Sequence, residues 1–131
     1  MSPVYGFVGA LLATVALLVG VALTGRMRKI RAHIGFVVCA VTSLGVAIYF
    51  AIRVGEVYDV EAAGRITPIH LTLARITTAA YLWPLLTGPL AARGKVRPIV
   101  HRSGAWAALV LTVAATVTGI MMLAGAERFA S

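Results

Sequence analysis

Apolar residues fill four long stretches of the chain, and polar residues gather in the short segments between them. The apolar stretches cover about residues 3–25, 32–53, 66–92 and 99–125. Because about 20 mainly apolar residues cross a hydrocarbon core roughly 30 Å thick, each stretch predicts a transmembrane helix. Short connections imply that neighbouring helices run antiparallel. The pattern therefore predicts an all-α membrane protein, a single domain over residues 1–131 folded as an up-down-up-down four-helix bundle.

Composition supports a membrane protein and not a soluble one. The chain is 60% hydrophobic, and its mean hydropathy of +0.95 exceeds that of soluble globular proteins. The first apolar stretch begins within "MSPVYGF", which has no basic residue, and it continues for some twenty residues, so we expect a membrane helix there and not a secretory signal.

Charge predicts the orientation of these helices. The net charge is +8, and every acidic residue lies toward the ends of the helices that face the 54–65 connection or the C-terminus. The positive-inside rule places the two basic connections in the cytoplasm and both termini outside. Anionic lipid headgroups account for the basic residues, so no nucleic-acid partner is implied. The basic residues at the two connections are Arg26, Arg28, Lys29, Arg31, Arg93, Lys95, Arg97 and Arg102.

Two similar segments join the helices of each half. The segment "KIRAH" ends at His33 and "KVRPIVH" ends at His101, and a Thr-Gly pair precedes each, at Thr24-Gly25 and Thr87-Gly88. Two hairpins of the same orientation can be related by an axis along the membrane normal, as in parallel-repeat membrane proteins. The alternative is convergence, because any cytoplasmic turn favours such residues.

His33 and His101 are the candidate metal ligands. Both are predicted near the cytoplasmic ends of their helices, at equal depth and on helix sides rich in small residues. Ligation of one haem iron by two imidazoles requires this placement. Either histidine alone is also typical of an amphipathic residue at a wet membrane boundary. The arginines that could hold the haem propionates are Arg28, Arg31, Arg97 and Arg102.

His70 and Arg75 lie near the opposite end of the third apolar stretch. His70 is predicted about 30 Å from the other histidines, so it cannot share a ligand with them. Its candidate metal partners there are Met121 and Met122. Arg75 has two interpretations. It either faces the bundle interior, where it holds a propionate, a quinone carbonyl or an acid of the 56–61 loop, or it extends to the outer surface.

Other features shape the expected bundle. Helix 3 is expected to begin near Thr67-Pro68 and to kink at Pro84, which has no N–H to donate. Small residues recur along the first helix, which predicts close helix packing. They are Gly6, Gly9, Ala13, Ala16 and Gly20.

The sequence has no Gly-rich phosphate loop and no Cys pair. No acid falls inside a predicted span, which argues against a proton-coupled exporter.

The segment from Ile69 to Gly119 resembles small bacterial membrane families. In this chain the matching motifs are His70, Gly88-Pro89-Leu90-Ala91 and His101-Arg102-Ser103-Gly104, and the similarity covers roughly residues 26–122. One such family is tied to cytochrome oxidase assembly, and their layout is similar to transmembrane b-type cytochromes. The resemblance implies a multi-pass protein of the bacterial inner membrane. These families often carry further histidines where this chain has "IYFAIRVG", residues 48–55, so one haem b is favoured over two.

The expected function is that of a b-type cytochrome-like membrane oxidoreductase. It would carry haem b near the cytoplasmic side and pass electrons between a membrane quinol and a redox partner protein. Two alternatives remain: a cofactor-free accessory or assembly subunit of a respiratory oxidase, and a protein that hands over haem or metal.

Overall fold

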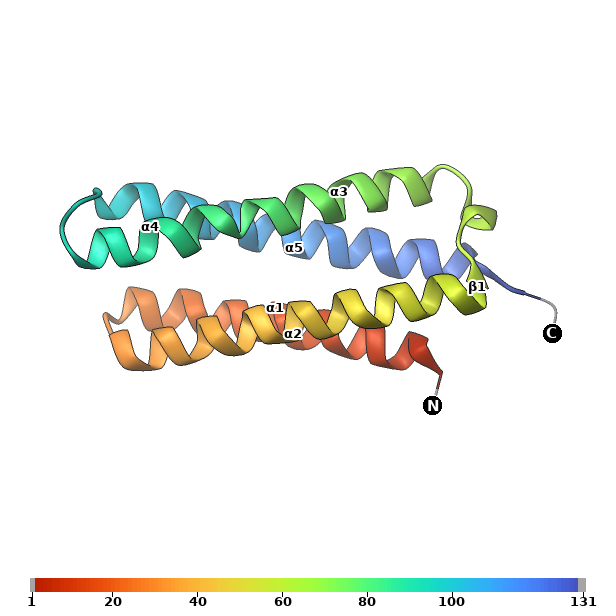
Figure 1. Cartoon of the computed structure of the whole chain (residues 1–131), viewed down its shortest axis with the longest axis horizontal. Helices are drawn as coiled ribbons and strands as arrows, with labels where there is room; N and C mark the ends of the chain where they lie inside the picture. Colours follow the sequence, from red (N-terminus) through yellow and green to blue (C-terminus); the bar gives the residue numbers. More distant parts are fainter. Residues whose placement is uncertain (1, 130–131) are drawn as a thin grey trace.

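The structure, a computed structural model, describes residues 2–129 and is mostly helical. The helices form two antiparallel hairpins that lie side by side along their length (Figure 1). The first hairpin is α1 (Pro3–Arg26) and α2 (Ile30–Val57); the second is α3 (Ile66–Ala80) and α4 (Leu82–Ala92), which follow one another, and α5 (Pro98–Gly125). The 3-10 turn η1 (Glu61–Ala63) and the strand β1 (Tyr58–Asp59) connect the hairpins, and β1 pairs antiparallel with β2 (Glu127–Arg128).

Three helices, α1, α2 and α5, are each long and apolar enough to cross a membrane. The prediction of a mainly helical protein is therefore confirmed. The second helix is longer than its apolar stretch of 32–53, because it starts at Ile30 and continues to Val57. Polar residues extend it, and Arg53 and Glu56 form an ion pair of 2.6 Å one turn apart. Hydropathy marks only the part of a helix suited to hydrocarbon, so it misses such ends.

The third rod of the bundle, made of α3 and α4, is interrupted close to Pro84, where the sequence predicts a kink. A single residue, Tyr81, separates α3 from α4. Pro84 has no N–H, so the carbonyl of Ala80 lacks its usual partner one turn later. Tyr81 keeps helical angles of φ −62° and ψ −27°, and the Leu85 N–H donates to its carbonyl over 3.2 Å. The two helices therefore continue as one rod with a local break.

Both hairpin loops begin with a left-handed residue after the helix end. Arg28 has φ 57° and Gly94 has φ 69°. In each loop the next N–H reaches back five residues along the chain: Lys29 donates to the Thr24 carbonyl over 3.0 Å and Lys95 to the Leu90 carbonyl over 2.9 Å. This closure satisfies free helix carbonyls. Only Gly94 adopts the conformation without crowding by a Cβ atom.

The two hairpins bury equivalent positions. Thr87 follows Thr24 by 63 positions (87 − 24), and His101 follows His33 by 68 (101 − 33). The same two offsets relate most of the buried core. The related buried pairs are Thr14 and Thr77, Leu18 and Tyr81, Ala40 and Ala108, Ala47 and Ala115, and Val54 and Met122. The two short sequence matches are therefore part of a correspondence that runs the length of both hairpins.

A contact between a glycine and an aromatic ring occurs at the same level in both hairpins, but the helix that supplies the ring differs. In the first hairpin a Cβ atom on Gly20 would lie 2.5 Å from the Phe36 ring, and in the second a Cβ atom on Gly104 would lie 2.6 Å from Trp83. The offsets relate Gly20 to Trp83 and Phe36 to Gly104. At this level of the bundle each hairpin packs an aromatic ring against a glycine, but α2 supplies the ring in the first hairpin and α4 supplies it in the second.

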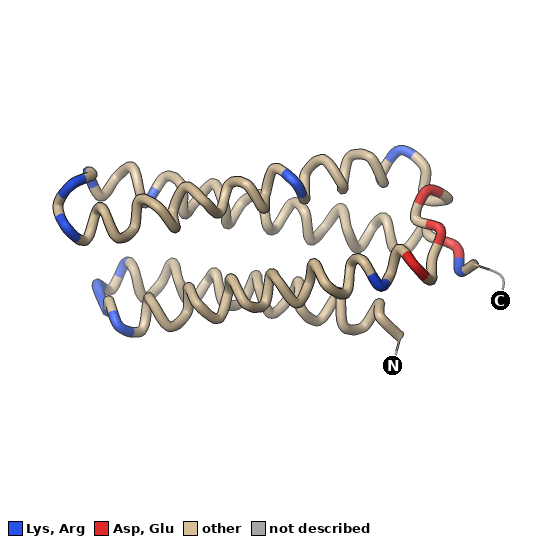
Figure 2. The backbone as a smooth tube through the Cα atoms, viewed as in Figure 1, with Lys and Arg blue, Asp and Glu red and all other residues tan. Residues whose placement is uncertain are grey.

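Charges separate to the two ends of the molecule. Figure 2 shows most Lys and Arg gathered at the α1–α2 and α4–α5 loops, whereas the acidic residues lie at the opposite end, together with Arg53, Arg65 and Arg128. The separation places each set of charges beyond the apolar middle of the helices, where water or headgroups solvate them. Arg75 is the exception, because it lies within α3.

Candidate functional site

The structure brings His33 and His101 together at the basic end of the molecule. His33 comes from α2 and His101 from α5, so each hairpin contributes one ring. The ring centroids are 6.2 Å apart, and the ring planes meet at 83° in an edge-on arrangement. Both side chains are partly buried. The side of α2 and α5 that carries them also carries buried small residues, which are Ala40, Ala47, Gly104, Ala108 and Ala115.

A Thr-Gly pair at the end of α1 holds the ring of His33. His33 Nδ1 lies 2.9 Å from the carbonyl oxygen of Val21, which also accepts from the Thr24 hydroxyl over 3.2 Å. A Cβ atom on Gly25 would lie 3.2 Å from His33 Cε1 and from Nδ1. Gly25 thus leaves the space that the imidazole edge occupies.

The second hairpin repeats this arrangement around His101. His101 Nδ1 lies 3.4 Å from the Thr87 hydroxyl oxygen, and a Cβ atom on Gly88 would lie 3.2 Å from His101 Cε1. Of the Thr-Gly pairs singled out in the sequence, Gly25 and both members of Thr87-Gly88 therefore contact the histidine that follows, whereas Thr24 shares the Val21 carbonyl with His33.

A third Thr-Gly pair holds the third histidine, and sequence reasoning missed it. His70 is buried, and its Nδ1 lies 3.1 Å from the hydroxyl oxygen of Thr118. A Cβ atom on Gly119 would lie 2.9 Å from His70 Cε1. The signal was present in the sequence as a third "TG", but it lies 48 residues after its histidine (118 − 70) and not shortly before it.

These contacts determine which ring nitrogen carries the proton. The Thr87 hydroxyl donates to the Trp83 carbonyl over 2.7 Å, so its oxygen accepts from His101 Nδ1–H. The Thr118 hydroxyl donates to the Ala114 carbonyl over 2.9 Å and likewise accepts from His70. For His33 the partner is itself a carbonyl. In the neutral form each histidine therefore keeps an unprotonated Nε2, the state in which an imidazole binds a metal.

The arginines predicted to hold haem propionates make no ion pair with an acidic side chain within the described part of the chain. Arg28, Arg31, Arg97 and Arg102 are all exposed at the loop end, and the one ion pair among residues 2–129 joins Arg53 to Glu56. The four arginines lie at the same end of the helices as the two histidines and pair with no acid in residues 2–129, so their guanidinium groups are available to an anionic group.

Arg75 is exposed on α3. It does not point into the bundle, and it pairs with no acid of the 56–61 loop in residues 2–129. The inward interpretation of Arg75 is therefore wrong for this structure. A long side chain at this position reaches along the outside of the helix instead.

The two methionines predicted as partners of His70 differ in their exposure. Met121 is 55% exposed, whereas Met122 is buried on the side of α5 that carries Gly119. Met122 alone lies on the face that contacts His70. Within residues 2–129, no group of three or more His, Cys, Asp or Glu side chains could hold a metal ion.

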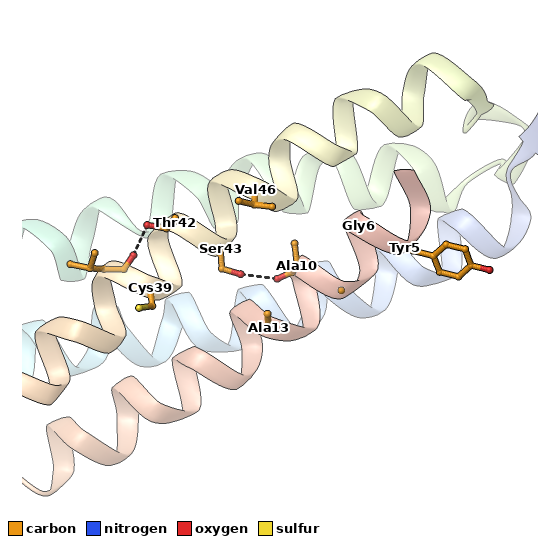
Figure 3. Close-up of a pocket in the computed structure, with 10 residues that line it drawn as sticks. Tyr5, Gly6, Ala10, Ala13, Cys39, Thr42, Ser43 and Val46 are labelled. Atoms are coloured by element: carbon orange, nitrogen blue, oxygen red, sulfur yellow. Dashed lines mark hydrogen bonds between the residues drawn. The ribbon is translucent and has the colours of Figure 1, made fainter. Parts of the chain in front are cut away.

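The small residues predicted to pack α1 face outward along much of their length. Gly9, Ala13 and Ala16 are exposed, and a groove of about 530 Å³ runs between α1 and α2 on this side. Figure 3 shows the groove, with Ala10 and Ser43 at its floor joined by a hydrogen bond of 3.1 Å. The expectation that the whole row packs inside this bundle is wrong, because only Gly6 and Gly20 meet a ring of α2.

No protein-family model, no curated protein and no solved structure matches this chain in the three comparisons made.

Proposed function

We propose that the protein is a b-type cytochrome-like electron carrier of the bacterial cytoplasmic membrane, with haem b held between His33 and His101. The observation that carries the proposal is the pair of imidazoles from separate hairpins, 6.2 Å apart, each with its Nδ1 within hydrogen-bond distance of an oxygen acceptor. When bound, haem iron gains and loses one electron. The chain would exchange electrons with a membrane quinol and with a redox partner protein.

The proposal includes four membrane crossings, with the third made by α3 and α4 together. Residues 66–92 at a rise of 1.5 Å each would extend roughly 40 Å, enough for a hydrocarbon core of about 30 Å. The charge separation supports a cytoplasmic location for both basic loops and an external location for both termini. Arg75 would then extend its guanidinium toward the outer headgroups.

The ring separation fits a single metal ion. Two metal–nitrogen bonds of about 2.0 Å, with roughly 1.2 Å from each ring centre to its nitrogen, would place the centroids about 6.4 Å apart. The observed separation of 6.2 Å is close to this. An angle of 83° between the ring planes is no obstacle, because each ring can take any rotation about its own metal–nitrogen bond.

The Thr-Gly pairs would position these ligands. An acceptor at Nδ1 fixes the tautomer and orientation of a ligating imidazole and raises its basicity. Gly25 and Gly88 let each ring lie against the preceding helix. The arginines at the loop end would neutralise the propionates at headgroup level.

The macrocycle itself requires room between the hairpins. Neither of the two cavities described in this structure includes His33 or His101. The proposal therefore requires the hairpins to part at the loop end when haem enters. This feature favours a second candidate, a protein that holds a bare metal ion or haem weakly between the same rings and hands it over.

The test is to express the protein with added haem precursor, purify it in detergent, and measure haem and metal per chain. We expect about one haem per chain, retained through extensive washing and lost in His101→Ala. Metal without porphyrin, or haem removed by washing, would favour handover. Protein without haem or metal would rule out both.

The outward groove on α1 and α2 favours a third candidate, a cofactor-free accessory or assembly subunit of a respiratory oxidase. Small residues let a partner helix approach closely in lipid. Here the expected result is co-purification with an oxidase that survives replacement of His33, His70 and His101 together.

A further inference from the structure

Arg75 is a charged side chain on the outside of the bundle, and two contacts of α3 show its level along α5. Just after it in the sequence, the Thr77 hydroxyl donates to the Leu111 carbonyl over 3.3 Å. One turn and a half before it, His70 Nδ1 lies 3.1 Å from the Thr118 hydroxyl oxygen. Arg75 is exposed, and it is therefore level with the part of α5 between Leu111 and Thr118.

This level is close to the middle of the apolar region. The uncharged stretch that contains most of α5 covers residues 103–126, and its midpoint falls between Ala114 and Ala115. In a hydrocarbon core about 30 Å thick, the midpoint is roughly 15 Å from either boundary. This distance exceeds the length of an extended arginine side chain. The guanidinium of Arg75 can therefore extend toward the outer headgroups without reaching them.

No acidic residue of this chain lies at the level of Arg75. All the acidic residues lie at the end opposite the basic loops (Figure 2), and Arg75 forms no ion pair within residues 2–129. A second copy in the same orientation would present its acids at that end too. A charge in the hydrocarbon is unfavourable and usually pairs with an opposite charge. The counter-charge for Arg75 must therefore come from another molecule.

The first hairpin shows which residue the repeated fold places at this position when it faces lipid. The offset of 63 relates Arg75 to Leu12 (75 − 12), which is 54% exposed. A leucine there needs no partner, because its side chain is as apolar as the lipid tails. The charge is thus a feature of the second hairpin and not of the repeated fold.

Small side chains flank Arg75 on the exposed side of α3. Thr72 and Thr78 lie one turn before and after it, and Ala79 lies next to Thr78. All three are exposed. Small residues let the backbones of two membrane helices approach closely. Another helix can therefore lie against α3 with one of its own side chains next to the guanidinium.

We propose that Arg75 docks a transmembrane helix of another protein, one that carries an aspartate or glutamate near the centre of the membrane. The carboxylate accepts two parallel hydrogen bonds from the guanidinium, and this pairing replaces the contact of an unpaired charge with lipid. The proposal rests on the four membrane crossings of the proposed function, because α3 must lie in the membrane. It requires neither haem nor the histidines, and it uses a different surface from the groove between α1 and α2.

The experiment measures helix association by fluorescence energy transfer in phosphatidylcholine vesicles. The full chain carries the donor at Cys39, its single cysteine. The probe is a synthetic leucine-alanine transmembrane peptide with one central glutamate, and the reference peptides have leucine or glutamine in its place. We expect the glutamate peptide to bind about tenfold or more tightly than the leucine peptide, as for a charge-assisted hydrogen bond. The glutamine peptide should bind less tightly than the glutamate peptide.

Three variants make the result specific. Arg75→Leu restores the residue of the equivalent position and should remove the preference for glutamate, whereas Arg75→Lys keeps the charge and should retain it. Arg65→Leu is the matched control, because Arg65 is also exposed but lies at the start of α3; it should leave the preference unchanged. An unchanged helical circular dichroism spectrum would show that each variant folds.

Equal binding of the glutamate and leucine peptides, or a preference that survives Arg75→Leu, would overturn the proposal. Loss of the preference in vesicles that contain phosphatidylglycerol would show that a lipid phosphate meets Arg75, and would also overturn it. A failure of the membrane setting is recognised separately, with Cys39 replaced by serine. If Arg75→Cys then reacted with a membrane-impermeant maleimide as fast as Arg65→Cys, the third crossing would be wrong and the docking proposal with it.

Discussion

Gly119 lies directly against the ring of His70, where a Cβ atom would be 2.9 Å from Cε1. The same relationship, slightly looser, joins Gly25 to His33 and Gly88 to His101. At His70 and His101 the hydroxyl of the threonine that precedes the glycine lies within hydrogen-bond distance of Nδ1. At His33 the Val21 carbonyl, three residues before Thr24, takes this place. All three histidines of the chain are thus held by one recurring arrangement, which leaves Nε2 as the nitrogen that can act on a ligand.

Adding one methyl group at Gly119 should destabilise the protein. In Gly119→Ala the new Cβ would press on the buried His70 ring, and such overpacking costs about 1–3 kcal/mol. The matched control is Gly45→Ala in α2, where no atom lies within 4 Å of a built Cβ; it should be neutral or slightly stabilising. The measurement is the free energy of unfolding in mixed micelles. Equal stability of the two variants would show that the ring does not need the glycine.

Removing the hydroxyl of Thr118 should allow His70 to populate its other tautomer, with the proton on Nε2. Thr118→Val deletes the acceptor for Nδ1–H, which should cost about 1–3 kcal/mol and raise the population of the Nε2–H form. Thr42→Val is the control, because Thr42 makes the same bond to a carbonyl one turn earlier but is exposed and contacts no histidine. Histidine ¹⁵N shifts report the tautomer. A His70 spectrum identical to that of the unchanged protein would contradict the assigned donor.

The left-handed turn at Arg28 predicts a stabilising substitution. Arg28→Gly should raise the free energy of unfolding by about 1 kcal/mol, because glycine adopts φ 57° without crowding. Arg26→Gly, two residues earlier at the helix end, removes the same charge and should not stabilise. Thermal unfolding in detergent distinguishes them, and a loss of stability in Arg28→Gly would contradict the turn.

Much of the helical layout follows from sequence, because hydropathy and proline chemistry are local. The four apolar stretches correspond to the observed rods, and Pro84 lies beside the break at Tyr81. The ends of α2 were missed, because Arg53 and Glu56 are polar yet helical. The sequence also did not determine whether the Arg75 side chain faces the bundle interior or the outside, because this depends on which face of α3 packs against α5.

Part of the candidate site could also be predicted from the sequence, because two of its histidines belong to a local pattern. His33 and His101 each follow a Thr-Gly pair within one hairpin, so a local repeat identified both. The contact of His70 with Thr118 and Gly119 joins α3 to the far part of α5. Only tertiary packing brings those residues together, and no local pattern carries that information. The offsets of 63 and 68 that relate the hairpins become convincing only when the buried positions are known.

The central claim is that His33 and His101 together hold one haem iron. Its most direct measurement is the visible absorption spectrum of the purified protein, oxidised and then reduced with dithionite, for the unchanged chain and for His33→Ala, His101→Ala and His70→Ala. The account predicts a reducible haem spectrum in the unchanged protein and in His70→Ala, and its loss in the other two. A colourless protein after haem-supplemented expression, or a pigment that persists without His33 and His101, would contradict it.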